Sequence, residues 1–178
     1  MIKLSYNIQD YRKQIMTTIK ENNTVIELGC HIGNTSKLII EKNVNLIALD
    51  NSPEAQKEIS KIESKNFQFI NNDVRLHETI LEVYKLIQKC DILCIDLGGG
   101  YHPDTVFKVF YIWSSTFKPK HTIIRNKGLI EFYNSINDIK GDFKSQNGYL
   151  DSYNDSGIPP QIKEFNLWTP MPKKNRGK

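Results

Sequence analysis

No stretch of this 178-residue chain stays apolar over the roughly 20 residues that a membrane-spanning helix requires. Residues 1–6 lack the long apolar core of a secretory signal peptide. Cysteine is scarce, and the odd count of three favours a reducing compartment over a disulfide framework. We therefore expect a cytoplasmic protein with no membrane partner.

The sequence also lacks the residue patterns that usually hold a metal ion. It has no Cys-x-x-Cys pair, and its four histidines are not clustered. Cys90 and Cys94 lie at the start of an apolar run and inside it, so we expect both to pack in the core. These absences disfavour a metal site built from cysteine and histidine.

Neither sign of charge dominates the chain. The 24 lysines and arginines exceed the 20 aspartates and glutamates by a formal net charge of +4, which does not by itself indicate a nucleic-acid partner. Basic residues do gather near the C-terminus, in residues 171–178. We expect a solvated tail there, and a phosphate-binding arm that engages nucleic acid is the alternative.

Length and composition fit a single globular domain over 1–178, because 39% of the residues are hydrophobic and 25% are charged. We expect an N-terminal helix within 1–20 and the main core within 24–140. The remainder, 141–178, holds a loop rich in Gly, Ser, Asn and Asp, an alternating segment at 161–168 that fits one strand, and the basic tail.

Apolar runs alternate with helical periodicities along the chain. Ile8, Tyr11, Ile15 and Ile19 recur at helical spacing and predict the first helix. The expected strands are 25–28, 45–50, 66–74, 91–96 and 121–125. The other expected helices are 34–40, one that begins at Pro53, 76–89, 103–116 and 128–139. This alternation predicts a parallel sheet that is covered on both faces and whose strands all end at one edge.

The most informative segment is 25–34, a short apolar run that opens into a turn containing Gly29 and Gly33. A strand, a tight turn and a helix N-terminus in this order are typical of a nucleotide-binding βα unit. Gly29 would let the backbone approach a ligand, because glycine accepts positive φ at little cost. Glu27 would repel a pyrophosphate, which disfavours an NAD-binding oxidoreductase.

The order Glu27-x-Gly29-x-His31-x-Gly33 resembles the first motif of class I S-adenosylmethionine-dependent methyltransferases, with His31 in the place of the middle glycine. In that family the loop passes beside the methionine end of the cofactor, where an acidic residue is tolerated. The resemblance covers roughly residues 24–130. It implies an α/β fold with a doubly wound, mainly parallel, Rossmann-like sheet and, in this chain, a shortened C-terminal region.

Later acids follow at the spacing of the same family. Asp50 ends the second apolar run, where the resemblance implies a ligand of the ribose hydroxyls. Asp73 with Val74 would address the adenine, and Asp96 would lie beside the sulfonium. The resemblance thus implies S-adenosylmethionine as cofactor. The residues expected to bind it are Glu27, Gly29, Cys30, His31, Gly33, Asn34, Asp50, Asn51, Asp73, Val74 and Asp96.

Candidate catalytic residues surround the glycine-rich segment 96–104, at the expected active-site edge. They are Asp96, His102 as a base or orienting group, and Asn126 after the fifth strand. Related catechol-type O-methyltransferases hold a divalent cation with such an Asp and with an Asp-Asn pair after the fifth strand. This chain has Arg125-Asn126 there, and a guanidinium opposes cation binding, so a divalent metal is disfavoured.

These observations predict a methyltransferase that acts on a small-molecule acceptor. Two alternatives stay open. One is a nucleic-acid methyltransferase acting on RNA and using the basic tail, although no Asn-Pro-Pro-Tyr-type motif follows the fourth strand. The other is a non-catalytic S-adenosylmethionine-binding protein.

Overall fold

The computed structural model describes residues 1–137, 141 and 144–150. Its elements, in chain order, are β1 (Ile2–Ser5), α1 (Ile8–Thr18), β2 (Thr24–Leu28), α2 (Asn34–Ile40), β3 (Asn45–Leu49), α3 (Pro53–Ile59), β4 (Phe67–Ile70), α4 (His77–Leu86), β5 (Ile92–Ile95), the 3₁₀ turn η1 (Gly98–Gly100), α5 (Pro103–Phe117), β6 (His121–Arg125) and α6 (Lys127–Asn134). Within this part of the chain the strands form one sheet in the order β1-β6-β5-β2-β3-β4, and every neighbouring pair is parallel.

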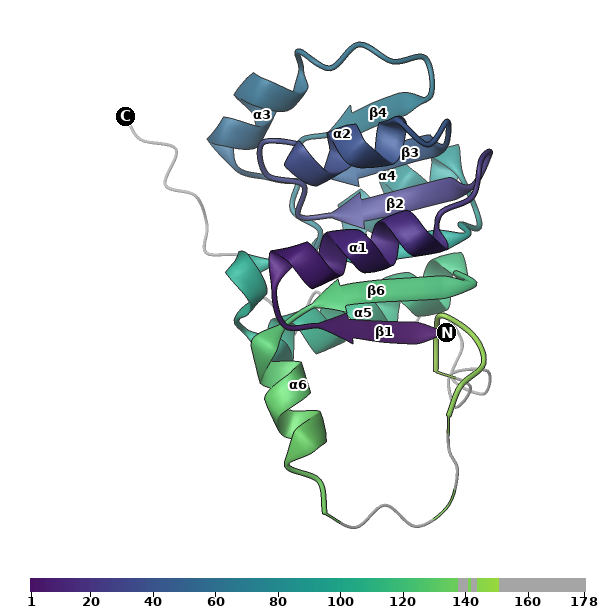
Figure 1. The fold of residues 1–178 in the computed structure, drawn as a ribbon. Helices are drawn as coiled ribbons and strands as arrows, with labels where there is room; N and C mark the ends of the chain where they lie inside the picture. The colour runs from purple at the N-terminus through teal and green to yellow at the C-terminus, as the bar shows by residue number, and fades with distance from the viewer. Residues whose placement is uncertain (138–140, 142–143, 151–178) are drawn as a thin grey trace.

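The sheet lies between two layers of helices (Figure 1). Successive strand residues point to opposite faces. Val25 and Leu46 therefore pack in one apolar cluster, to which α1, α2 and α3 contribute. Ile26 and Leu49 pack in the other, with α4 and α5. This arrangement confirms the predicted doubly wound α/β fold.

Local sequence signals explain where the helices begin. The Asn7 side chain accepts a hydrogen bond from the Asp10 N–H at the start of α1, and Ser52 accepts one from Ala55 N–H at the start of α3. Pro53 occupies the first position of α3, where its missing N–H costs nothing. The predicted start of this helix at Pro53 is therefore confirmed.

The core contains a pair of aromatic side chains and two cysteines. Trp113 and Phe117 are fully buried, and their stacked rings have centroids 5.3 Å apart. Cys90 and Cys94 are buried and form no disulfide. Their burial confirms the prediction that both cysteines serve packing.

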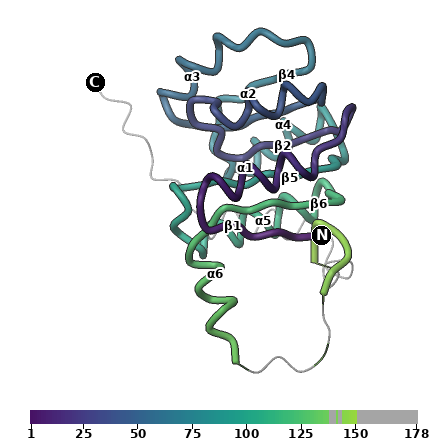
Figure 2. The backbone as a smooth tube through the Cα atoms, viewed as in Figure 1, coloured from purple at the N-terminus to yellow at the C-terminus, as the bar shows by residue number. Residues whose placement is uncertain are grey.

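Two predictions of secondary structure were wrong. Strand β1 was missed, although it pairs in parallel with β6 at the edge of the sheet (Figure 2). The helix expected over 128–139 is the shorter α6, which begins at Lys127, ends at Asn134 and buries none of its residues. The predicted strand at 161–168 and the basic tail at 171–178 lie outside the described residues.

Strand register places the carboxyl ends together. Leu28 lies opposite Leu49 on one side and opposite Ile95 on the other, and Ile95 lies opposite Ile124. The loops after β2, β3, β5 and β6 therefore leave the sheet along one edge. Open α/β sheets bind their ligands in the crevice at this edge.

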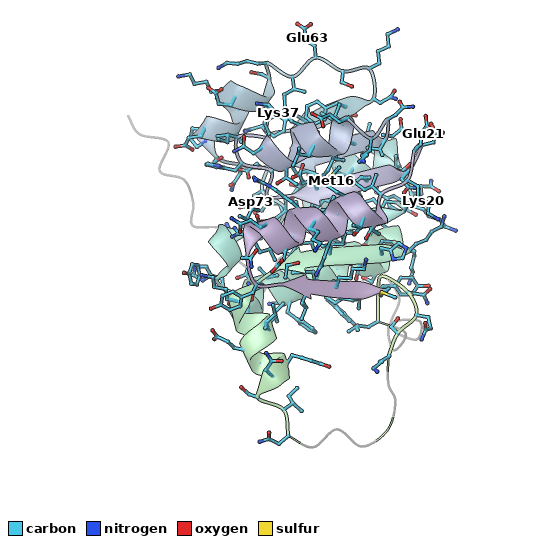
Figure 3. All side chains as sticks on the ribbon, viewed as in Figure 1. Met16, Lys20, Glu21, Lys37, Glu63 and Asp73 are labelled. Atoms are coloured by element: carbon cyan, nitrogen blue, oxygen red, sulfur yellow. The ribbon has the colours of Figure 1, made fainter. Side chains whose placement is uncertain are left out.

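Charged side chains cover the outer surface. Lys20, Lys37 and Glu63 are exposed and extend away from the sheet (Figure 3). Among the described residues, no helix has the length and apolar character needed to cross a membrane.

Candidate functional site

The turn after β2 depends on two glycines. Gly29 has φ +85°, and its N–H donates to the Leu49 carbonyl at 2.8 Å. A Cβ at Gly29 would lie 2.2 Å from the carbonyl oxygen of Asp96, so no side chain fits there. Gly33 has φ +79° and caps α2 from the left-handed region. The turn is therefore tight, and its backbone lies close to the end of β5.

The Asp50 carboxylate links the loop after β2 to the loop after β3 by hydrogen bonds. One oxygen, Oδ2, accepts the His31 N–H at 2.8 Å, and the other, Oδ1, accepts the Ser52 N–H at 2.8 Å. His31 itself has φ +47° and is exposed. The middle position of the predicted glycine motif is thus a left-handed turn residue, which explains the resemblance to a motif with glycine there.

Two cavities open along the carboxyl edge of the sheet on either side of this turn. The first has a volume of about 300 Å³ and the second about 520 Å³. The residues that line both are Gly29, Asp50, Asn51, Leu97 and Gly98. The two cavities are therefore halves of one cleft over β2, β3 and β5, within the size range of small-molecule sites.

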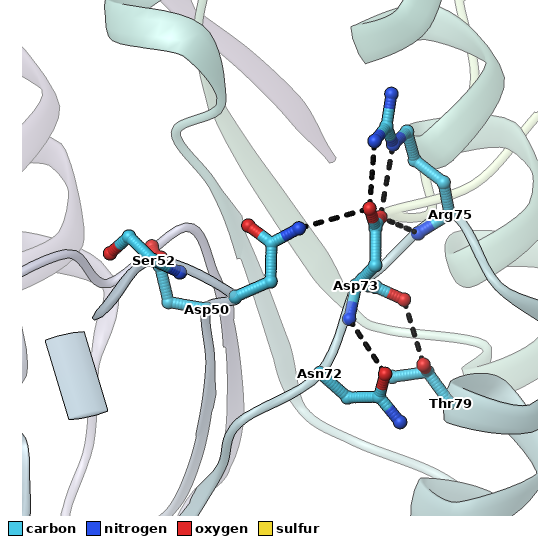
Figure 4. Close-up of polar contacts among 7 residues, drawn as sticks. Asp50, Ser52, Asn72, Asp73, Arg75 and Thr79 are labelled. Atoms are coloured by element: carbon cyan, nitrogen blue, oxygen red, sulfur yellow. Dashed lines mark hydrogen bonds and ion pairs between the residues drawn. The ribbon is translucent and has the colours of Figure 1, made fainter. Parts of the chain in front are cut away.

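The first half of the cleft contains a polar network centred on Asp73 (Figure 4). Arg75 donates from Nε at 3.0 Å and from Nη2 at 2.7 Å, and its backbone N–H adds a bond at 2.9 Å. Asn51 Nδ2 donates to Oδ2 at 3.0 Å. Burial acts to raise the pKa of Asp73, but these hydrogen bonds outweigh it and hold that pKa below its usual value. Asp73 is therefore an ionised, multiply bonded carboxylate.

Beside Asp73, the Val74 carbonyl accepts the indole N–H of Trp113 at 2.8 Å. Trp113 thus ties the floor of the first half to α5. Apolar side chains of Leu49 and Val106 complete the lining. The result is a partly apolar recess with one polar side.

The second half of the cleft contains an ion pair. Arg125 Nε donates to Asp96 Oδ1 at 2.7 Å, with the side chains 17% and 13% exposed. Burial raises the pKa of Asp96, while the adjacent Arg125 opposes this rise. Asp96 and Arg125, which follow β5 and end β6, are therefore brought together, as parallel neighbouring strands require.

Arg12 of α1 also lines the second half of the cleft, and the sequence did not single it out. Its Nε donates to Thr35 Oγ1 at 3.1 Å, which ties α1 to α2. The terminal nitrogens of Arg12 form no hydrogen bond within the described part of the chain. The sequence could have indicated Arg12, because it directly follows Tyr11, a residue of the buried face of α1.

Glu27 lies below the cleft and lines neither half. Its side chain is buried between the sheet and α2, where Ser36 Oγ donates to Oε2 at 2.5 Å. Burial raises the pKa of Glu27 to about 7, although the bond from Ser36 opposes the change. The buried phenol of Tyr11 lies in the same layer, and its hydroxyl has no hydrogen-bond partner among the described residues.

The other predicted site residues divide between the cleft and the scaffold. Cys30 and Asn34 line the second half, and burial raises the pKa of the Cys30 thiol. His102 lines the first half and is exposed. Asn126 lines neither half: its Oδ1 caps α6 at Leu129 N–H, and its Nδ2 donates to the Tyr101 carbonyl at 2.8 Å.

No group of three or more His, Cys, Asp or Glu side chains that would suit a metal ion occurs among the described residues. Asp96 is the acid that the sequence analysis compared with a metal ligand, and it is paired with the Arg125 guanidinium.

Comparison with known proteins identifies the fold. No protein-family model matches the sequence. A protein of Clostridium thermocellum described as an rRNA methylase superposes with a TM-score of 0.52 at 14% identity, covering 75% of this chain and 82% of that chain. An rRNA methylase of Streptococcus thermophilus superposes with a TM-score of 0.51 at 11% identity, covering 75% and 81%. The chain therefore shares the α/β fold of these two proteins, which is the fold that the resemblance of its motifs implied.

Proposed function

We propose that this protein is an S-adenosylmethionine-dependent methyltransferase that acts on a small-molecule acceptor. The observation that carries the proposal is the single cleft formed by two cavities that meet at Gly29 and Asp50. It lies at the carboxyl edge of a parallel sheet, where ligands of such folds bind. The similarity in fold to two proteins described as methylases supports the same assignment.

The lining of the cleft fits the three chemical parts of the cofactor. Asp50 lies at the junction, and each of its oxygens accepts one hydrogen bond, which leaves capacity for a ribose hydroxyl. Leu49 and Val106 offer the adenine an apolar surface in the first half. Arg12 offers a guanidinium to the carboxylate of the amino-acid end in the second half.

The polar edge of the adenine would form a hydrogen bond with the Val74 backbone rather than with the Asp73 carboxylate. The Asp73 carboxylate already accepts four hydrogen bonds, from Arg75 and Asn51, which fills its usual acceptor capacity. The Val74 N–H makes no hydrogen bond within the described residues. We therefore assign Asp73 the task of shaping the recess and Val74 the task of donating to the ring.

When bound, S-adenosylmethionine supplies a methyl group already activated for in-line displacement, so the protein must align the acceptor and exclude water. Asp96 is placed for the first task. One of its oxygens is held by Arg125, and Oδ2 makes no hydrogen bond with a described residue. That oxygen can accept a proton from an acceptor hydroxyl or amine, and the raised pKa of Asp96 favours the transfer.

Calorimetry with S-adenosylmethionine, S-adenosylhomocysteine and NAD tests the proposal. We expect the two adenosyl ligands to bind and NAD to bind far more weakly. Asp50→Asn removes the charge and one acceptor, and should weaken S-adenosylhomocysteine binding by about tenfold or more. Glu54→Gln is the matched control, because Glu54 is an exposed acid nearby that lines neither half of the cleft.

Two results would contradict the proposal. Equal affinity for NAD would remove the cofactor assignment. An unchanged affinity in Asp50→Asn would remove the ribose assignment. Cofactor binding without methyl transfer to any compound in an acceptor screen would instead favour a non-catalytic binding protein.

A further inference from the structure

Three side chains from segments that adjoin the second half of the cleft form a cluster. They come from separate segments: Tyr6 follows β1, Tyr101 follows η1, and Lys127 begins α6. The Lys127 ammonium lies 5.3 Å from the centroid of the Tyr6 ring and 4.9 Å from that of Tyr101. It also donates to the Tyr101 hydroxyl at 3.3 Å. We call these three side chains the rim cluster.

The backbone fixes the rim cluster next to the cleft. Ser5, which precedes Tyr6, lies opposite Arg125 in the sheet, and Arg125 lines the second half. Gly98 and Gly99 line the same half, three and two residues before Tyr101. Asn126 is fully buried and holds the Tyr101 carbonyl while capping α6. The rim cluster is therefore attached to the cleft by the sheet, the glycine turn and a buried clamp.

The rim cluster combines two exposed aromatic rings with a lysine that forms no salt bridge with a described residue. Tyr6 is 46% exposed and Tyr101 is 57% exposed, and both belong to segments that adjoin residues lining the cleft. Lys127 forms no salt bridge with any described residue, so its charge is balanced by no neighbouring acid. Aromatic faces stack on planar rings, and an unpaired ammonium attracts an anion.

We propose that Tyr6, Tyr101 and Lys127 bind the methyl acceptor, and that this acceptor is a small molecule with a planar aromatic ring and an anionic group. This inference rests on the proposed function, since the rim cluster adjoins the half of the cleft that contains Asp96. The tyrosine rings take the planar ring, and Lys127 takes the carboxylate or phosphate. A structured RNA is disfavoured, because its phosphates require several cations and Lys127 is the one cation of the rim cluster.

Ligand binding to the protein loaded with S-adenosylhomocysteine tests the inference. The probes are 2-naphthoate, the uncharged ring 2-naphthol, the non-planar anion cyclohexanecarboxylate, and a short single-stranded oligouridylate. We expect 2-naphthoate to bind most tightly, since it alone among the small probes combines both features. Calorimetry measures each affinity.

Variants separate the two contributions. Lys127→Met should weaken 2-naphthoate binding by about five- to tenfold and leave 2-naphthol binding almost unchanged. Tyr101→Leu should weaken both by about fivefold or more. Lys85→Met on α4 and Tyr133→Leu on α6 are the matched controls, because both side chains are exposed and neither belongs to the rim cluster.

The affinity for S-adenosylhomocysteine distinguishes the failure of this inference from that of the proposed function. We expect it to stay unchanged in Lys127→Met and Tyr101→Leu. If wild-type protein binds S-adenosylhomocysteine but prefers 2-naphthol, cyclohexanecarboxylate or the oligouridylate to 2-naphthoate, or binds none of them, the inference is wrong. Equal effects of the variants and the controls would also overturn it. Loss of S-adenosylhomocysteine binding in the wild type would refute the proposed function itself.

Discussion

Replacing Gly29 by alanine should destabilise the protein through one identifiable contact. Gly29 has φ +85°, and an added Cβ would lie 2.2 Å from the Asp96 carbonyl oxygen, far inside van der Waals contact. The left-handed backbone costs an alanine about 1–2 kcal/mol. The clash adds about 1–3 kcal/mol, as for other overpacked sites, because a backbone atom must move.

We therefore expect the Gly29→Ala variant to lose roughly 3 to 4 kcal/mol of unfolding free energy, from an expected total of about 5–15 kcal/mol. Gly99→Ala is the matched control. Gly99 has φ +67°, but the nearest atom to its Cβ, in the Tyr101 ring, is 4.0 Å away. That variant should lose only about 1–2 kcal/mol from the backbone conformation. Alanine also lowers the entropy of the unfolded chain by a similar amount in both variants.

Equilibrium unfolding in urea, followed by far-ultraviolet circular dichroism, measures both losses. The difference between the two variants isolates the contact with Asp96. Equal losses in Gly29→Ala and Gly99→Ala would refute the reasoning, because they would show that the end of β5 moves away at no cost. A normal stability of both variants would refute the left-handed assignment as well.

Three further predictions concern buried groups. The pKa of Glu27 is raised to about 7 in the folded state, so between about pH 4.5 and 7 this carboxyl stays protonated in the folded protein and ionises in the unfolded chain. Stability should therefore fall by roughly 3 kcal/mol as pH rises through this window, and urea unfolding of Glu27→Gln should show no such fall. Arg125→Leu leaves Asp96 without its partner and should cost about 2–3 kcal/mol at pH 8, with a smaller loss at acidic pH where Asp96 is protonated, as measured by unfolding at both pH values. Trp113→Phe removes the hydrogen bond to the Val74 carbonyl and some core volume, so a thermal melt should show a loss of roughly 2 kcal/mol.

The strands that could be predicted are those whose apolar runs are buried on both faces. Residues 45–49 and 121–125 carry this signal by themselves, and both form strands. Strand β1 carries none, because only one of its four residues, Ser5, is buried. Its pairing with β6 joins residues more than a hundred positions apart, and no local pattern reports such a contact.

In the site, the residues that spacing determines could be predicted, and the contacts that side-chain conformation determines could not. Gly29 and Asp50 were found because they end successive strands of a parallel sheet, and such ends meet at one edge. The hydrogen bonds that Arg75 donates to Asp73 depend on one side-chain conformation, which the sequence does not specify. Asn126 directly precedes α6, and asparagine is a common N-cap residue. Its capping role was missed because the helix was predicted to begin one residue too late, at 128.

Arg125 bears directly on the chemistry of the cleft, because it pairs with Asp96. Catechol-type O-methyltransferases, which the motifs of this chain resemble, hold a divalent cation with carboxylates that follow the corresponding two strands. Here the end of β6 carries a guanidinium that binds Asp96 directly. Lys127, two residues later, adds an ammonium at the rim. Arg125 is neutralised by its pairing with Asp96, so Lys127 is the cation left to attract an anionic group of the proposed acceptor. An acceptor with its own negative charge can be oriented by Lys127 directly, with Oδ2 of Asp96 left to take its proton.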